Sequence, residues 1–258
     1  IHVWFFGRNH RRSTSRLMTY LFLAVVGAFV GVINGMAGGA SIISYPALLA
    51  VGLNPLSAVV TNALGAMPAN FLAVRHHKVS FVKLARENAT LILASVIGTL
   101  IGAVLLLNMP IGTLEKLIPF LLLFATCTLL IPIPERPTGM DNRKEAAAIF
   151  GTGLYCGYFG PGQGVMVSAT LARDARRSPS LLNATKNVIV GVTVVMSNIV
   201  YALSGYVNWA CAIALGIGAG IGGNFGGKWA TQMSATFYRR LVFAVGICST
   251  IGLFIKYY

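Results

Sequence analysis

Long runs of apolar residues, separated by short groups of charged residues, dominate this sequence. No Asp, Glu, Lys or Arg occurs within residues 17–74, 88–114, 117–134, 146–172, 187–227 or 241–255. A helix needs about 20 residues to cross the hydrocarbon core of a bilayer. The pattern therefore predicts an all-α polytopic membrane protein.

Turn residues and charges divide these runs into about eight expected transmembrane helices. They cover residues 17–37, 56–74, 88–107, 114–131, 146–159, 180–203, 207–225 and 241–257. We expect a basic lead-in at 1–16, a first transmembrane repeat at 17–132, a polar linker at 133–145 and a second repeat at 146–258. The polar segment 75–87 is expected to be a loop.

Two glycine-rich stretches interrupt the apolar runs, at residues 34–41 (NGMAGGAS) and 156–164 (CGYFGPGQG). Glycine disfavours helix, so each stretch predicts a break, followed by a half-helix at 40–50 or 164–172 with Ser41 as a possible N-cap of the first. In lipid, broken backbone persists only where protein or a water-filled cavity satisfies its polar groups. Paired breaks of this kind indicate a transporter substrate site.

The two halves of the chain repeat the same order of features. Gly35 and Gly157 are 122 residues apart, and Thr61 and Thr185 are 124 residues apart. The loop charges fit either membrane topology. We favour inverted repeats, because these are the commoner origin of paired broken helices around a midplane site.

Composition agrees with a membrane location, since 56% of residues are hydrophobic and 10% charged, against roughly 25% charged in soluble domains. The net charge of +14 comes from short basic groups beside apolar runs, with neither a basic stripe nor an aromatic platform for nucleic acid. The lead-in is expected to be interfacial or soluble and lacks signal-peptide order. The chain does not begin with Met, so we expect it to start upstream of Ile1. The four cysteines lack CxxC spacing and are expected to be buried, inert thiols.

The acidic residues are all expected in loops or at the edges of spans, which leaves no mid-membrane carboxylate for a proton relay. They are Glu87, Glu115, Glu135, Asp141, Glu145 and Asp174. His76 and His77 are expected to be a solvated loop pair. No catalytic set, metal-ligand spacing or nucleotide motif occurs, so we expect neither enzyme activity nor a cofactor.

Lys186 is the one charged residue placed within an expected span, where an ion is costly and suggests function, although snorkelling to the interface is an alternative. The N-termini of the half-helices present free N–H groups and partial positive charge. Together these features predict a site for a small anion. The candidate substrate-binding residues are Asn34, Gly38, Gly39, Ser41, Thr61, Asn62, Gly162, Gln163, Gly164, Thr185, Lys186 and Asn187.

Two other classes remain open at this point. A membrane-embedded enzyme would need an intramembrane carboxylate, histidine or metal set. A small-anion channel, or a permease of another substrate, would share the composition, although a channel does not need two mobile breaks. Saturation of flux and counterflow would separate a carrier from a channel.

Motifs in both halves carry a family resemblance that covers nearly the whole chain. They are Gly35-x-x-Gly38-Gly39, Pro46-Ala47-Leu48-Leu49, Pro55 and Thr61-Asn62, then Gly157-x-Phe159-Gly160-Pro161-Gly162-x-Gly164, Ala184-Thr185-Lys186-Asn187 and Ser197-Asn198. With them the sequence resembles the TauE/SafE sulfite-exporter family. The resemblance implies export of sulfite, or of small organosulfonates such as sulfoacetate, across the bacterial inner membrane.

Overall fold

The computed structural model describes residues 3–36, 39, 41–75, 81–130, 141–174, 177–229 and 235–258. Within these residues the chain forms α-helices and no strand, which confirms the predicted all-α class. The helices are α1 (Val3–Met36), α2 (Ser41–Ala50), α3 (Pro55–Arg75), α4 (Phe81–Glu87), α5 (Ala89–Leu107), α6 (Ile111–Thr128), α7 (Asn142–Tyr158), α8 (Gln163–Leu171), α9 (Pro179–Leu203), α10 (Trp209–Trp229) and α11 (Ala235–Tyr257). Gly38, His76, His77 and residues 131–140 of the linker region lie outside the described residues.

Five helices in the described residues are long and apolar enough to cross a membrane. They are Arg16–Asn34, Ala89–Leu107, Ile111–Thr128, Ser180–Leu203 and Arg240–Tyr257. The other three expected spans correspond to α3, α7 and α10. Of these, α7 has 17 residues and a charged first turn, and the apolar part of α10 is the shorter stretch Trp209–Asn224. The chain is thus a multi-pass membrane protein, and the total of eight spans stays a prediction.

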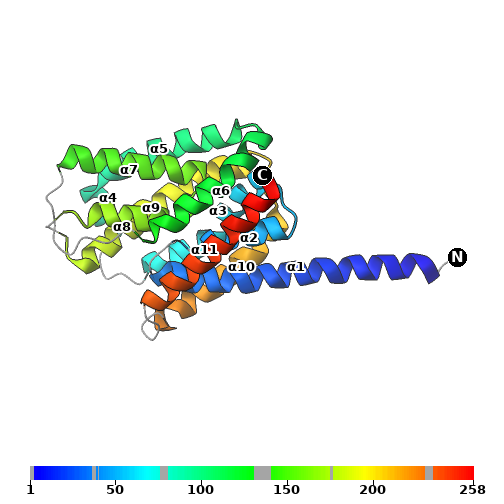
Figure 1. Cartoon of the computed structure of the whole chain (residues 1–258). Coiled ribbons are helices and arrows are strands. Elements are labelled where there is room, and N and C mark those ends of the chain that lie inside the picture. Colours follow the sequence, from blue (N-terminus) through cyan, green and yellow to red (C-terminus); the bar gives the residue numbers. More distant parts are fainter. Residues whose placement is uncertain are drawn as a thin grey trace.

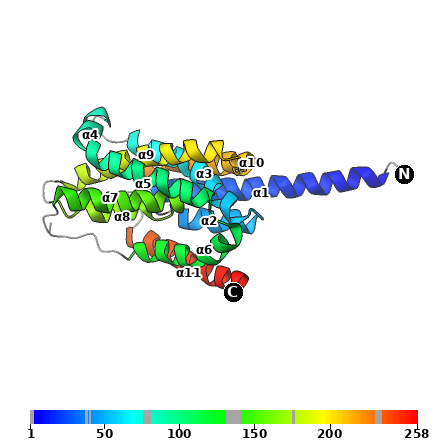
Figure 2. The same ribbon diagram turned by 90° about the horizontal axis from the view of Figure 1, so that it is seen from above.

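In α1 the helix continues without a break from Val3 into the first span and projects beyond the bundle (Figures 1 and 2), so the lead-in at 1–16 stays a prediction and is drawn as helix from Val3 on. One local expectation is corrected by the helices. The segment 75–87 is not all loop, because its second part forms α4. This short helix forms because Leu84 is buried in an apolar cluster with Ala184 and Val188 of α9.

Both glycine-rich stretches are breaks followed by short helices. Between α1 and α2, Gly39 has a φ of 86°, and between α7 and α8, Gly160 and Gly162 have φ values of 96° and 88°. Such left-handed backbone is open to glycine at little cost. Since α2 begins at Ser41 itself, the cap position precedes this serine, and the N-cap of α8 is Gly162.

Two helix pairs pack with their backbones in contact, α1 against α10 and α5 against α7 (Figures 1 and 2). A Cβ added at Gly27 would lie 2.1 Å from the carbonyl oxygen of Leu215, and one at Gly102 would lie 2.1 Å from that of Leu154. Small residues at these positions allow close approach, as is usual where helices associate in membranes. Each pair joins a helix that precedes residue 131 to a helix that follows residue 140.

The cysteines divide into two groups. Cys156 and Cys211 are buried, as expected, whereas Cys127 and Cys248 are exposed on the outside of the bundle. The expectation that all four thiols are buried is therefore wrong for two of them. Both exposed cysteines lie on helices that are long and apolar enough to span a membrane, α6 and α11.

Candidate functional site

The two breaks line one small cavity of about 70 Å³, which we call the central cavity. Its walls come from the first break and the start of α2, from α3, from the second break and the start of α8, and from α9. A Cβ built at Gly39 would be 3.7 Å from the side chain of Val165 in α8. The first break thus contacts the short helix that follows the second break.

Seven of the predicted substrate-binding residues line the central cavity. They are Asn34, Gly39, Ser41, Asn62, Gly162, Gln163 and Gly164. These residues are separated by up to 130 positions along the chain. The fold brings them together because both short helices start at this point and α3 passes beside them.

The two buried amide side chains in this cavity present hydrogen-bond donors. Ser44 donates to Oδ1 of Asn62 at 2.5 Å, so that the acceptor of this amide is occupied while its NH₂ group remains for a ligand. Gln163 is 4% exposed, and its Nε2 has no hydrogen-bond partner among the residues that the structure describes. A buried donor without a partner costs roughly 1–3 kcal/mol, which a bound acceptor would recover.

The N-terminus of α8 adds backbone donors to the same wall. Gln163 N–H donates to the Gly160 carbonyl, and Val165 and Met166 N–H donate to the Gly162 carbonyl. The N–H of Gly164 lies between them and is available to a ligand. Because the first turn of a helix carries partial positive charge, this wall favours an anion.

The second break is held rigidly by aromatic residues. Tyr155 OH donates to the Pro161 carbonyl at 2.7 Å, and Tyr201 OH donates to the Gly157 carbonyl. The ring of Phe159 packs edge-on against Tyr45 of α2, with ring centroids 5.1 Å apart. These contacts fix the backbone donors of the cavity and connect the two breaks.

Three of the predicted site residues do not line the central cavity, namely Thr61 on α3 and Thr185 and Asn187 on α9. Thr61 accepts a hydrogen bond from the N–H of Asn208 at 3.0 Å and so ties α3 to the connection between α9 and α10. Thr185 lines a different cavity, near the start of α9. Asn187 lines neither of these two cavities.

Lys186 is 5% exposed and lines neither cavity. Its ammonium group makes no hydrogen bond or ion pair with any described residue. Side chains on a helix lean toward its N-terminus, so this one leans away from the central cavity and toward the start of α9. Gly38, the remaining predicted residue, lies outside the described residues.

The cavity also contains residues that were not singled out as site residues from the sequence. They are Ala63, Ala66, Cys156, Phe159, Gly160, Val190, Val194 and Ser197. Polar Ser197 within a long apolar helix was a usable signal, because a hydroxyl in a span often faces a partner or a cavity. None of the described residues that line the central cavity is charged. Its electrostatic character comes from amide and hydroxyl donors and from helix ends.

Comparison with known proteins places this arrangement in a family. Residues 23–253 match the family model described as "Sulfite exporter TauE/SafE". A probable membrane transporter protein, ORF9 of Sinorhizobium sp, is 28% identical over 254 residues, which cover 92% of each chain. One from Haemophilus influenzae is 26% identical over 253 residues, 91% of this chain and 93% of the relative. Another, YfcA of Escherichia coli K12, is 28% identical over 215 residues, 76% of this chain and 75% of the relative. No solved structure matches this chain significantly.

Proposed function

The chain belongs to the sulfite exporter TauE/SafE family and is a membrane transporter, and from this premise we propose that it exports small sulfur-containing anions. Sulfite, or an organosulfonate such as sulfoacetate, would leave the cell across the bacterial inner membrane. The anion would bind in the central cavity, between the two breaks.

The observation that carries this proposal is the unpartnered amide of Gln163 at the N-terminus of α8. A sulfite ion bears its charge on several oxygens, each of which accepts hydrogen bonds. Its transfer from water into the protein is costly unless donors replace the hydration shell. The side chains of Gln163 and Asn62 and the backbone N–H of Gly164 offer donors to the one cavity, and hydrogen bonds to an ionised group are the strong ones.

The volume of the cavity favours a compact substrate. A single water needs about 10–15 Å³ of such space, and the central cavity offers about 70 Å³. This is room for an ion with a few heavy atoms, but not for a long organic chain. Among the candidate substrates, sulfite therefore fits the described conformation better than sulfoacetate does.

The helix contacts support a repeated, inverted construction around this site. If α1, α2, α3, α5 and α6 correspond in order to α7, α8, α9, α10 and α11, the contact of α1 with α10 corresponds to that of α7 with α5. The contacts of α3 with α9 and of α6 with α11 then join equivalent helices. Such exchange about a pseudo-twofold axis is the arrangement found in transporters that bind substrate at the repeat interface.

Reconstitution into liposomes tests the transported substrate directly. Uptake of radiolabelled sulfite, sulfoacetate, taurine, sulfate and chloride is compared, and we expect saturable sulfite uptake with counterflow. Flux that rises linearly with concentration and lacks counterflow would identify an anion channel instead. Absence of uptake for both sulfur(IV) and sulfonate anions would refute the proposed substrate class.

Variants of Gln163 test the binding site separately. The change Gln163→Met keeps the volume but removes the donor, and losing a hydrogen bond to an ion costs about 1.5–3 kcal/mol, or roughly tenfold to a hundredfold in affinity. Gln163→Glu places a negative charge there and should abolish sulfite binding. The control is Thr250→Val, a buried change on α11 whose hydroxyl bonds only to the Gly246 carbonyl. Parent-like binding by Gln163→Met would exclude the central cavity as the site.

A further inference from the structure

We propose that a second cavity, between α4–α5, the start of α7 and the α8–α9 connection, is the vestibule through which the central cavity opens to one face of the membrane. Its gate consists of an ion-pair latch and an apolar plug. We call this cavity the ion-pair vestibule. The proposal rests on the proposed function, because it assigns the route by which the anion reaches or leaves its site.

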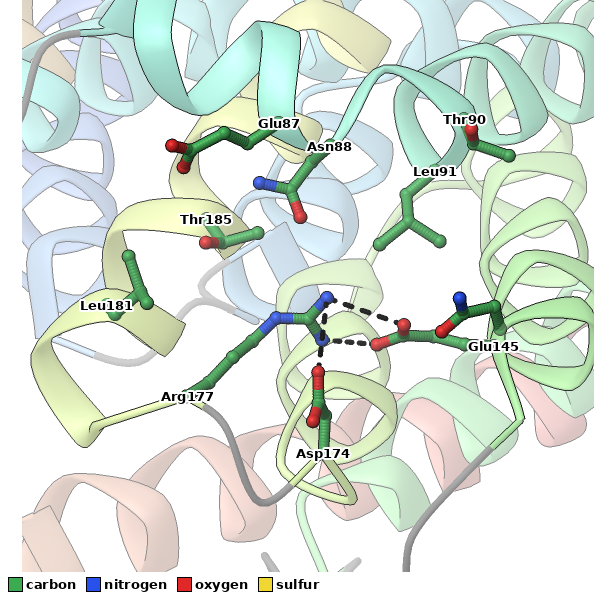
Figure 3. Close-up of a pocket in the computed structure, with 10 residues that line it drawn as sticks. Glu87, Asn88, Thr90, Leu91, Glu145, Asp174, Arg177, Leu181 and Thr185 are labelled. Carbon is green, nitrogen blue, oxygen red and sulfur yellow. Dashed lines mark hydrogen bonds and ion pairs between the residues drawn. The ribbon is translucent and has the colours of Figure 1, made fainter.

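The ion-pair vestibule is larger than the central cavity, with a volume of about 370 Å³. Its walls come from helix ends that lie at the same end of the bundle. Figure 3 shows the side chains that line it. Thr185 lines it from α9, is 1% exposed and makes no hydrogen bond with any described residue. The cavity thus extends from exposed Glu87 inward to a buried part of α9.

The latch is formed by Arg177 with Glu145 and Asp174 (Figure 3). The guanidinium binds both carboxylate oxygens of Glu145, and its Nη2 lies 3.8 Å from Oδ2 of Asp174. The three side chains are only 11%, 5% and 10% exposed. Burying such a cluster gains little net stability, because desolvation offsets the attraction. The ion pairs hold Arg177 and Asp174 against Glu145 of α7 in one arrangement. When these side chains separate, water can replace the ion pairs at little cost, as a gate requires.

An apolar plug separates the vestibule from the central cavity. Its buried members are Leu91, Ile149, Val167, Leu171 and Ile189. Leu91 also lines the vestibule, and Val190, which packs against the plug, lines the central cavity. Thr185 and Val190 are five positions apart on α9, which is a rise of only about 7.5 Å. A small rearrangement of this cluster would therefore join the two cavities.

Lys186 lies on α9 between Thr185 and Val190, and its position bears on the choice of route. Its buried ammonium has no partner among the described residues, and an unpaired buried ion is costly. An anion that passes between the cavities would supply the missing partner. The lysine would thereby lower the barrier for anions and raise it for cations.

A third cavity lies at the corresponding place in the other half, and its volume is about 420 Å³. It is lined from the start of the α1 span, from the α2–α3 connection and from the α9–α10 connection. Ser57 of this cavity and Asn62 of the central cavity are also five residues apart, on α3. None of its described lining residues is acidic. The central cavity thus has a potential route on either side, and only the ion-pair vestibule has a carboxylate latch in the described residues.

Thiol labelling tests the route, because Cys156 lines the central cavity. The other three cysteines are replaced by serine, and a membrane-impermeant methanethiosulfonate is applied to either face of sealed vesicles. We expect slow labelling of Cys156 in this background. A second reporter, Thr185→Cys in a fully cysteine-free chain, should react rapidly from one face only. If Thr185→Cys is unreactive from both faces, the vestibule is not open and the proposal is wrong.

The latch is tested by the triple change Glu145→Gln, Asp174→Asn and Arg177→Gln, which removes all three charges of the latch together. Labelling of Cys156 from the vestibule face should rise by roughly tenfold, which corresponds to a latch contribution of about 1.4 kcal/mol. The matched control neutralises Lys83 alone, whose side chain is 71% exposed at the same end of the bundle and does not line the vestibule, and should leave labelling unchanged.

Two further results complete the test. The exchange Glu145→Arg with Arg177→Glu, made together with Asp174→Asn so that no second carboxylate faces position 177, restores an ion pair and should return Cys156 labelling toward the background rate. Unchanged labelling in a folded triple variant, or an equal rise in the Lys83 control, would overturn the gate. Sulfite uptake is measured on the same proteins without the reagent. Loss of uptake in every protein, the unmodified one included, would refute the substrate while leaving the labelling result to judge the gate.

Discussion

Replacing Gly157 by alanine tests whether the contact between α5 and α7 positions the second break. The added Cβ would lie 2.0 Å from the Thr99 carbonyl oxygen and 2.8 Å from the backbone nitrogen of Ala103. Ordinary contact for a Cβ begins near 3.4 Å, and both atoms belong to the backbone of α5. The two helices must therefore separate locally by more than 1 Å.

The expected cost follows from this overlap. Overpacking of a well-packed site typically costs about 1–3 kcal/mol, and the gain from replacing glycine by alanine inside a helix, roughly 0.5–1 kcal/mol, opposes it. We expect a net loss of about 1–2 kcal/mol in the free energy of unfolding. Because the Gly157 carbonyl also accepts the hydrogen bond of Tyr201, its displacement should disturb the cavity and lower sulfite uptake.

The assay is thermal unfolding of the detergent-purified protein, followed by uptake in liposomes. Gly151→Ala is the matched control, because Gly151 lies on the same helix and a Cβ there would meet no atom within 4 Å. This control should melt at or above the parent temperature and keep full uptake. If Gly157→Ala melts and transports like Gly151→Ala, the two helices are not held by close backbone contact.

Three further changes have expected outcomes. Lys186→Met should slow sulfite uptake without weakening binding in the central cavity, because the lysine lies beside the proposed route and does not line that cavity, while Lys83→Met should change neither; an unchanged uptake rate would leave Lys186 a structural role only. Tyr155→Phe removes the hydrogen bond to the Pro161 carbonyl and should lower the free energy of unfolding by about 0.5–1.5 kcal/mol, measured by thermal melting. Glu115→Gln should leave pH-driven uptake unchanged, since proton coupling through a carboxylate is not expected; abolished uptake with intact counterflow would contradict this.

The breaks could be predicted from the sequence because glycine-rich backbone has a direct local cause. The glycine-rich stretches 34–41 and 156–164 each contain a break in an apolar run, so the positions of α2 and α8 follow closely. The short helix α4 was missed because it depends on burial of Leu84 against α9, and a polar segment does not reveal its tertiary partner. Local glycine content thus determines where α2 and α8 begin, whereas packing against a distant helix determines α4.

The residues that line the central cavity could be predicted reliably only where the chain passes through a break. Asn62 lines the cavity, whereas its neighbour Thr61 bonds to Asn208 on another side of α3. Adjacent positions on a helix point in different directions, and the sequence does not show which of them faces the cavity. The same holds on α9, where Val190 and Val194 line the cavity but Lys186 does not. Knowing that a helix contributes to a site therefore does not tell which turn contributes.

The two close-packed helix pairs have a mechanical consequence for transport. Because α1 is joined to α10 and α5 to α7, each half of the chain is fastened to the other at two places. A swing of one half against the other, as a rigid clamshell, would have to slide backbones past one another where a single methyl group does not fit. The two helix pairs are therefore expected to stay fixed during transport. The movement that exposes the substrate to alternate sides is then left to the elements between these pairs, chiefly the short helices α2 and α8 and the ends of α3 and α9.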